Sequence, residues 1–498
     1  MCKKKVVIIG AGLGGLSCGV ILSKNGYEVT VLEQCAQAGG CLQCFTRRGA
    51  KFETGMHFIG SASEGQTLDR LLCYLEVRKD ISLSQLDPSG YEVISLNGRQ
   101  YRFANGREAF IEQMSDYFPH EREHLIRYFN LVEKVAGASS LHSLKYAKTD
   151  TAVNTEYQLR SINEVIDETI SDPLLAKVLV GNLPLYAAEK DKTPFSTHAF
   201  IMDFYNQSAY RVVGGSDAIA SSMIRTIERY GGRVLTDCKA LKITCDEYQA
   251  TGVECGEGQW LPADYVISGI HPMRTLELID SKLIRPAFRN RINSIPQTVG
   301  GFSVYLEFKE DSMPYMNHNF YGYNTDTPWG CEHYDESVWP KGFLYMHFCQ
   351  QPSPRYAKTG VILSYMQMSE VEKYDAGQGR RKEGYAAFKH EKAERLIDAV
   401  EQHLPGLRQC IRHYYTSTPL TYRDYTGTEG GSMYGIAKDV HLGSACRVPH
   451  RTRIPNVFQT GQNINSHGML GVLVGTIVTC SELLTAKTIY EQIQNNKE

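Results

Sequence analysis

Three glycines and one acidic residue near the start of the chain have the types and spacing of a dinucleotide-binding site. Gly10, Gly12 and Gly15 form the pattern GxGxxG. In such a loop the first glycine permits a tight turn, the second lets the backbone approach a pyrophosphate, and the third lets a helix pack closely against a strand. Glu33 follows at the position where a carboxylate accepts hydrogen bonds from ribose hydroxyls.

The segments around these residues have the pattern that such a site requires. Residues 6–9 and 29–32 are apolar runs, as expected for parallel strands buried on both faces. The helix between them ends at Gly26, and its N-terminus offers free N–H groups to phosphates. A glycine-rich turn in another α/β protein is one alternative. A signal peptide is another, but glycines interrupt the apolar stretch early and no small-residue cleavage site follows it.

The composition narrows the class of protein. With 498 residues the chain has room for two or three domains, and its net charge of −2 gives no indication of a nucleic-acid partner. No run of about 18 apolar residues predicts a membrane-spanning helix. Fourteen scattered cysteines without a signal peptide predict free thiols in a reducing, cytoplasmic compartment. Cys41 and Cys44 form a CxxC pair, but no second pair at zinc spacing accompanies it.

Three stretches that lie far apart in the sequence predict one discontinuous nucleotide-binding domain: 1–65, 214–285 and 440–498. The second begins with a helix after Ser216 and continues with short strands that resemble a small meander. The third has a strand at 457–459 that enters a turn at Gly461, then a loop over 463–471 and a helix over 472–490. Segments 66–213, expected to be largely helical, and 286–439 are predicted to build a substrate domain.

Further motifs carry a family resemblance. Gly39 and Gly40 follow Glu33 closely, and residues 38–60 read AGGCLQCFTRRGAKFETGMHFIG. The chain resembles the two-dinucleotide-binding-domain flavoproteins, in the branch of phytoene desaturases, carotenoid isomerases and all-trans-retinol 13,14-reductases (retinol saturases), and is most similar to the last. Segments 183–186, 194–199, 214–216, 431–435 and 460–462 extend the resemblance.

The resemblance implies an α/β fold of the Rossmann-like, glutathione-reductase type, with an inserted mixed α+β substrate domain. It also implies FAD as the cofactor. Glu33 would hold the adenosine ribose, Ala240 would present its backbone to adenine, and Gly461 with Gln462 would contact the pyrophosphate and ribityl groups. Gln462 stands where many relatives have an acid. The full set of implied FAD contacts is Gly10, Ala11, Gly12, Gly14, Gly15, Glu33, Gly39, Gly40, Ala240, Gly461, Gln462, Met469 and Leu470.

By the same resemblance the protein is expected to be an FAD-dependent oxidoreductase that reduces, desaturates or isomerises a C=C bond of an apolar isoprenoid or polyene, with hydride transfer at flavin N5. His57, Tyr186 and His198 are the candidates for catalytic proton transfer. Each has an alternative interpretation as a core residue. Tyr186, Phe200, Phe204, Tyr205 and Tyr210 are expected to line an apolar tunnel or to pack in the core.

Two other functions fit the same fold. One is a flavin amine oxidase, and the other is a prenyl-binding protein without enzymatic activity, against which the intact glycine loop and Glu33 argue. No second GxGxxG follows a strand, so a bound nicotinamide domain is not expected. An apolar substrate also raises the hypothesis of peripheral contact with a membrane. The sequence leaves the substrate, the direction of the reaction, the external electron donor or acceptor and the oligomeric state open.

Overall fold

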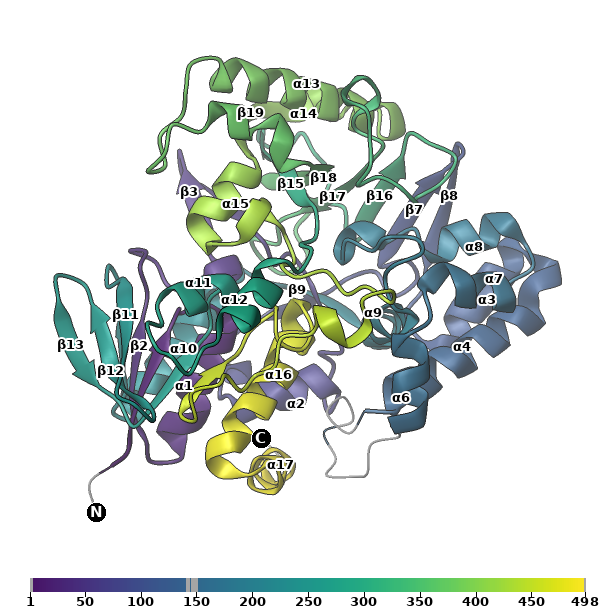
Figure 1. Cartoon of the computed structure of the whole chain (residues 1–498). Coiled ribbons are helices and arrows are strands. Elements are labelled where there is room, and N and C mark those ends of the chain that lie inside the picture. The colour runs from purple at the N-terminus through teal and green to yellow at the C-terminus, as the bar shows by residue number, and fades with distance from the viewer. Residues whose placement is uncertain (1–2, 140–143, 145–150, 497–498) are drawn as a thin grey trace.

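The N-terminal strand belongs to a five-stranded parallel sheet that joins distant parts of the chain. The computed structural model describes residues 3–139, 144 and 151–496. The strand order is β10-β2-β1-β14-β20. Purple, teal and yellow segments of the ribbon therefore lie together in the lower part of Figure 1. The strands are β1 (Lys5–Ile9), β2 (Glu28–Leu32), β10 (Arg233–Leu235), β14 (Tyr265–Ser268) and β20 (Val457–Gln459).

Three helices pack around this sheet: α1 (Leu13–Lys24), α10 (Asp217–Arg229) and α16 (Gly468–Leu484). α1 contacts both of the others, and the close approach to α10 depends on Gly19. A Cβ atom at Gly19 would lie 2.7 Å from Cδ1 of Ile227. Most of α16 is buried, which explains why its sequence has no polar face.

A small antiparallel sheet lies beside the parallel one, within the segment for which the sequence predicts a meander of short strands. Two other strands of that segment, β10 and β14, belong to the parallel sheet instead. The strands of the antiparallel sheet are β11 (Ala240–Cys245), β12 (Ala250–Cys255) and β13 (Gln259–Pro262). Strand β12 contacts β14, so this sheet and the parallel sheet share one hydrophobic core.

A seven-stranded mixed sheet forms the upper part of the molecule, in the order β19-β15-β18-β17-β16-β7-β8 (Figure 1). Strands β15, β17 and β18 are buried on both faces. Helix α13 (Tyr385–His403) packs against β17 and β18. The strands are β7 (Glu92–Leu96), β8 (Arg99–Phe103), β15 (Gly300–Phe308), β16 (Asn319–Tyr323), β17 (Gly342–His347), β18 (Thr359–Met366) and β19 (Ile411–Ser417).

Smaller elements connect the two large sheets. Strands β5 (Ile59–Gly60), β9 (Ala209–Val212) and β6 (Leu83–Gln85) form one short sheet, and β3 (Cys44–Arg47) pairs with β4 (Ala50–Glu53). The helices of this part are α2 (Thr67–Tyr74), α3 (Arg107–Tyr117), α4 (Arg122–Gly137), α6 (Thr151–Gln158), α7 (Ile162–Thr169), α8 (Pro173–Leu179), α9 (Phe195–Gln207), α11 (Pro272–Glu277), α12 (Pro286–Asn293), α14 (Leu407–Cys410) and α15 (Pro419–Thr426).

The predicted α/β architecture is confirmed, and segment 66–213 is largely helical as predicted, although it also contributes β7 and β8 to the seven-stranded sheet. Two local expectations near the C-terminus are corrected. The predicted loop 463–471 is shorter, since α16 begins at Gly468. The helix expected over 472–490 breaks at Thr485, and α17 (Ala486–Asn495) follows at an angle of 119°. Thr485 has a φ of 91°, which no helix accommodates.

The helices of the described residues bear on the prediction that the chain has no membrane-spanning helix. No single one of them has both the length and the apolar composition to cross a bilayer. The bent pair α16–α17 meets these criteria only when the two helices are counted together.

Candidate active site

The loop between β1 and α1 has the shape of a phosphate cradle. Gly10 has a φ of 92°, a conformation that favours glycine. A Cβ atom at Gly15 would lie 1.9 Å from the carbonyl oxygen of Gly10, so helix and turn can approach this closely only with glycine there. At Gly12, in contrast, a Cβ atom would have no neighbour within 4 Å. The loop therefore leaves open space in front of Gly12, at the N-terminus of α1.

The Gly39–Gly40 pair packs directly on this loop. The amide N–H of Gly39 donates to the carbonyl oxygen of Ala11 over 2.8 Å. A Cβ atom at Gly40 would lie 3.2 Å from Cα of Gly12. Both glycines have a positive φ, of 125° and 55°. This second glycine segment thus forms another wall of the cradle and places no side chain inside it.

The C-terminal segment contributes the third glycine contact. A Cβ atom at Gly14 would lie 3.0 Å from Cα and N of Gly461, which follows β20 with a φ of 99°. Beside it, the buried hydroxyl oxygen of Thr460 has no hydrogen-bond partner among the described residues. Met469 and Leu470 are buried in the first turn of α16, and Gln462 is partly exposed.

Glu33 has a contact that the sequence analysis does not predict. One of its carboxylate oxygens accepts from the amide of Ala11 over 2.9 Å, and the other accepts from the amide of Cys35 over 3.0 Å. The side chain is 8% exposed. Glu33 therefore fastens the glycine loop to the end of β2. Its carbonyl accepts from the amide of Cys238 over 2.8 Å, which brings the start of β11, with Ala240, to the same edge.

These observations fit FAD. Three glycine segments enclose an open space at a helix N-terminus, where a pyrophosphate binds favourably. The buried, unpartnered Thr460 hydroxyl lies next to Gly461, and Glu33 and the start of β11 lie together, as their predicted contacts with adenosine require.

Gly40 also lines a cavity of about 630 Å³. Its walls come from β3, β15, β19, α13 and α15. Its aromatic lining consists of Phe45, Tyr305, Tyr414, Tyr415, Tyr422 and Tyr425. Arg47 and Lys389 also line it, and no Asp or Glu is among its described lining residues. The volume is in the range of pockets that enclose a small organic molecule.

The tyrosines around the cavity are arranged by ring contacts and hydroxyl bonds. The Tyr305 and Phe45 ring centroids are 4.9 Å apart in an edge-to-face contact, and the Tyr305 hydroxyl lies 3.2 Å from Oγ of Ser417. The Tyr415 hydroxyl oxygen is buried and has no hydrogen-bond partner in the described part of the chain. Burial raises the pKa of Tyr305 and of Tyr422, so both phenols remain protonated at neutral pH.

The comparison with known families agrees with this geometry. The sequence profile described as "Flavin containing amine oxidoreductase" matches residues 13–474. The chain belongs to this family of flavin oxidoreductases. It is thus an FAD-dependent oxidoreductase by family, as the sequence predicts.

Individual relatives are similar over nearly the whole chain. The human protein named all-trans-retinol 13,14-reductase is 28% identical, and the alignment covers 99% of this chain and 87% of that protein. A lycopene-forming phytoene desaturase of a Paracoccus species is 22% identical, with 97% of each covered. Among solved structures, an oxidoreductase from Methanosarcina mazei superposes with a TM-score of 0.65 at 16% identity, covering 96% of this chain and all of that one. A putrescine oxidase variant superposes with a TM-score of 0.64 at 15% identity, over 99% of this chain and all of the other.

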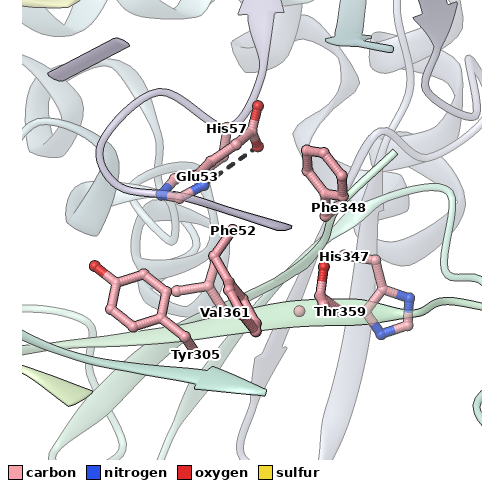
Figure 2. A pocket seen from close by; sticks show the side chains of 9 residues that line it. Phe52, Glu53, His57, Tyr305, His347, Phe348, Thr359 and Val361 are labelled. Atoms are coloured by element: carbon pink, nitrogen blue, oxygen red, sulfur yellow. Dashed lines mark ion pairs between the residues drawn. The ribbon is translucent and has the colours of Figure 1, made fainter. Parts of the chain in front are cut away.

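Within this flavin oxidoreductase, His57 is not among the residues that line the large cavity. Its Nδ1 is 3.6 Å from Oε2 of Glu53, whose other carboxylate oxygen accepts from the amide of Ser216 over 3.1 Å. Both side chains line a small cavity (Figure 2). Its volume of about 10 Å³ is enough for about one water molecule. Tyr305 lines both this small cavity and the larger one.

Tyr186 and His198 lie in a buried hydrogen-bonded triad. The Tyr186 hydroxyl is 2.8 Å from Nδ1 of His198, and the Tyr128 hydroxyl is 2.7 Å from Nε2. Burial lowers the pKa of His198 to about 3, so the imidazole is neutral and both of its nitrogens have partners. Neither residue lines the 630 Å³ cavity. Their predicted catalytic role stays a prediction, and this geometry supports a structural role.

For the aromatic residues predicted to line a tunnel or to pack in the core, the structure supports core packing. Tyr186, Phe200, Phe204, Tyr205 and Tyr210 do not line the 630 Å³ cavity. Phe204 and Tyr205 instead pack against each other, with ring centroids 5.0 Å apart. The tyrosines of β19 and α15 line the cavity. The sequence shows the tyrosine-rich run 414–425, but only the tertiary fold brings this run and Gly40 to the same cavity.

Proposed function

We propose that this flavin oxidoreductase acts on a C=C bond of an apolar, isoprenoid-like substrate. The observation that carries the proposal is the position of Gly40. This residue packs on Gly12 in the cradle and also lines the aromatic cavity, so cofactor site and cavity meet there. When bound, FAD supplies two-electron chemistry at carbon, which tyrosine side chains alone do not.

The side chains of the cavity bind and orient the substrate. Phe45, Tyr305 and Tyr422 offer ring faces and edges to an unsaturated chain and exclude water from it. His57 is the candidate to deliver a proton, and its Nδ1 lies 3.6 Å from Oε2 of Glu53.

Relatives support the choice of substrate class. The names of similar proteins describe a reductase of all-trans-retinol, an isomerase of prolycopene and a desaturase of phytoene. These reactions share a polyene or its precursor as substrate, although they differ in redox direction. The proposal therefore concerns the C=C bond and leaves the direction to experiment.

Amine oxidation is the second candidate, because putrescine oxidase and cyclohexylamine oxidase share the fold. The charge of the cavity argues against it. A cationic amine would meet Arg47 and Lys389 and no carboxylate among the described lining residues. Like charges in a confined site repel the ligand.

Anaerobic redox titration tests the proposal. The FAD-loaded protein is photoreduced without oxygen, and retinoids, carotenes and unsaturated lipids are added one at a time. We expect one of these compounds to reoxidise the reduced flavin and restore its oxidised spectrum. If the reaction runs in the other direction, the saturated form of that compound should reduce and bleach the flavin of the oxidised enzyme. In parallel, the oxidised enzyme is mixed with primary amines and diamines. Bleaching by amines, together with no response to any unsaturated lipid, would contradict the proposal.

A further inference from the structure

Two cations of the 630 Å³ cavity have no acidic partner. The Arg47 guanidinium on β3 donates to the carbonyl oxygen of Thr46 over 3.0 Å and lies 5.6 Å from the Phe45 ring centroid. The Lys389 ammonium on α13 lies 5.0 Å from the Tyr385 ring centroid. Within residues 3–139, 144 and 151–496, no carboxylate lies within 4.0 Å of either charged group.

Two other cations on the elements that form the cavity are paired with carboxylates. Arg423 on α15 lies 2.7 Å from a carboxylate oxygen of Asp375, and Arg412 on β19 lies 3.8 Å from one of Glu307. The positive charge of Arg47 and Lys389 is therefore not neutralised by the protein, and it faces a space that a ligand can enter.

The surroundings of these cations favour an anion. The lining has tyrosine and threonine hydroxyls but, among its described members, no Asp or Glu. Partial burial, together with the nearby charge of Arg381, lowers the pKa of Lys389. A carboxylate bound next to this ammonium would offset both effects, because an opposite charge favours the protonated lysine. Charge-assisted hydrogen bonds to Arg and Lys are about twice as strong as neutral ones.

We infer that the substrate is an unsaturated apolar chain that ends in a carboxylate, with Arg47 and Lys389 binding the carboxylate while the tyrosines hold the chain. This inference rests on the proposed function and narrows it from apolar isoprenoid-like compounds to unsaturated acids. It makes Arg47 and Lys389 specificity-determining residues.

Matched acids and esters test the inference. All-trans-retinoic acid is compared with its methyl ester, and linoleic acid with methyl linoleate, by equilibrium dialysis against the FAD-loaded protein. We expect at least one acid to bind at least tenfold more tightly than its ester, as hydrogen bonds to charged groups predict. Arg47→Gln and Lys389→Gln should each remove most of this preference and leave ester binding within about twofold. Arg47→Lys should retain part of it.

The control is Lys282→Gln, which removes an exposed lysine away from the cavity. The flavin absorbance of each variant reports whether it is folded and loaded. Equal binding of acids and esters would overturn the inference while leaving the proposed function in place. Equal loss of acid and ester binding in both variants would also overturn it, because such residues would only shape the cavity. Binding of no acid and no ester would contradict the proposed function as well.

Discussion

At the scale of single residues, a buried acid makes the stability of this protein depend on pH. Glu92 on β7 accepts hydrogen bonds from the Tyr321 hydroxyl over 2.8 Å and from the Asn182 amide over 3.1 Å. Burial raises the pKa of Glu92 to about 7, from an ordinary value of 4.5. The folded protein therefore keeps a proton that the unfolded chain releases, and the free energy of unfolding falls as the pH rises from about 4.5 to 7.

Glu92→Gln should remove this dependence. Glutamine resembles the protonated acid, and the unpartnered Oδ1 of Asn182 can accept its amide after a flip. We expect the variant to unfold with a free energy about 3 kcal/mol higher than the parent above pH 7 and nearly equal to it below pH 4.5. Urea unfolding at several pH values measures this. A difference that does not vary with pH would contradict the assignment of Glu92.

Tyr186→Phe separates the structural from the catalytic interpretation of the buried triad. The substitution leaves Nδ1 of the fully buried His198 without its partner. We expect the free energy of unfolding to fall by about 1–3 kcal/mol and turnover at saturating substrate to stay within a few-fold. Unchanged stability with turnover lost by two orders of magnitude would establish the catalytic role instead.

His57→Ala tests the remaining catalytic candidate. We expect the variant to retain bound FAD, because His57 contacts Glu53 and the small cavity rather than the glycine loop. Turnover should fall by about 10²–10⁴, the usual contribution of a positioned acid or base. His120→Ala, an exposed histidine, is the control. Full activity in His57→Ala would reject the catalytic role, and loss of FAD would assign His57 to the cofactor site.

At the scale of elements, the β1–α1–β2 unit shows what a sequence predicts well. Hydrophobic runs, glycine spacing and Glu33 are local signals, and the strands and helix formed where these signals placed them. The contact of Glu33 with the Ala11 amide was not predicted, because side-chain direction at the strand end depends on how β2 and the loop meet. The break between α16 and α17 was also missed, since the apolar pattern continues across Thr485.

Two alanine substitutions in this unit should have different effects. At Gly12 the added methyl group meets no protein atom, so Gly12→Ala should fold normally and melt like the parent once FAD is removed. The methyl group would occupy space in front of the loop, and we expect FAD affinity to fall at least tenfold. Gly15→Ala places a Cβ atom 1.9 Å from the Gly10 carbonyl oxygen and should destabilise the protein with or without FAD. Thermal melts and FAD titrations of both variants measure these effects. Tight FAD binding by Gly12→Ala would contradict the proposal that this loop binds FAD.

At the scale of the whole molecule, the site is built from segments that only the fold brings together. Gly14 and Gly461 touch although nearly the whole chain separates them, and β3, β19 and α15 enclose one cavity. Motif resemblance predicts the cofactor residues, because the backbone roles expected of them constrain their sequence. Motif resemblance could not predict the residues that line the cavity, namely its tyrosines, Arg47 and Lys389. An aromatic ring or a positive charge can reach the same point in space from many positions in a sequence.

The most direct test of the account is an FAD titration of the purified, cofactor-stripped protein. The central claim is that the three glycine segments form one cradle for FAD, next to the aromatic cavity. We predict saturation at one FAD per chain, with absorbance in the 450 nm region that shifts when an unsaturated ligand fills the cavity. Protein that stays colourless after incubation with excess FAD would contradict the claim.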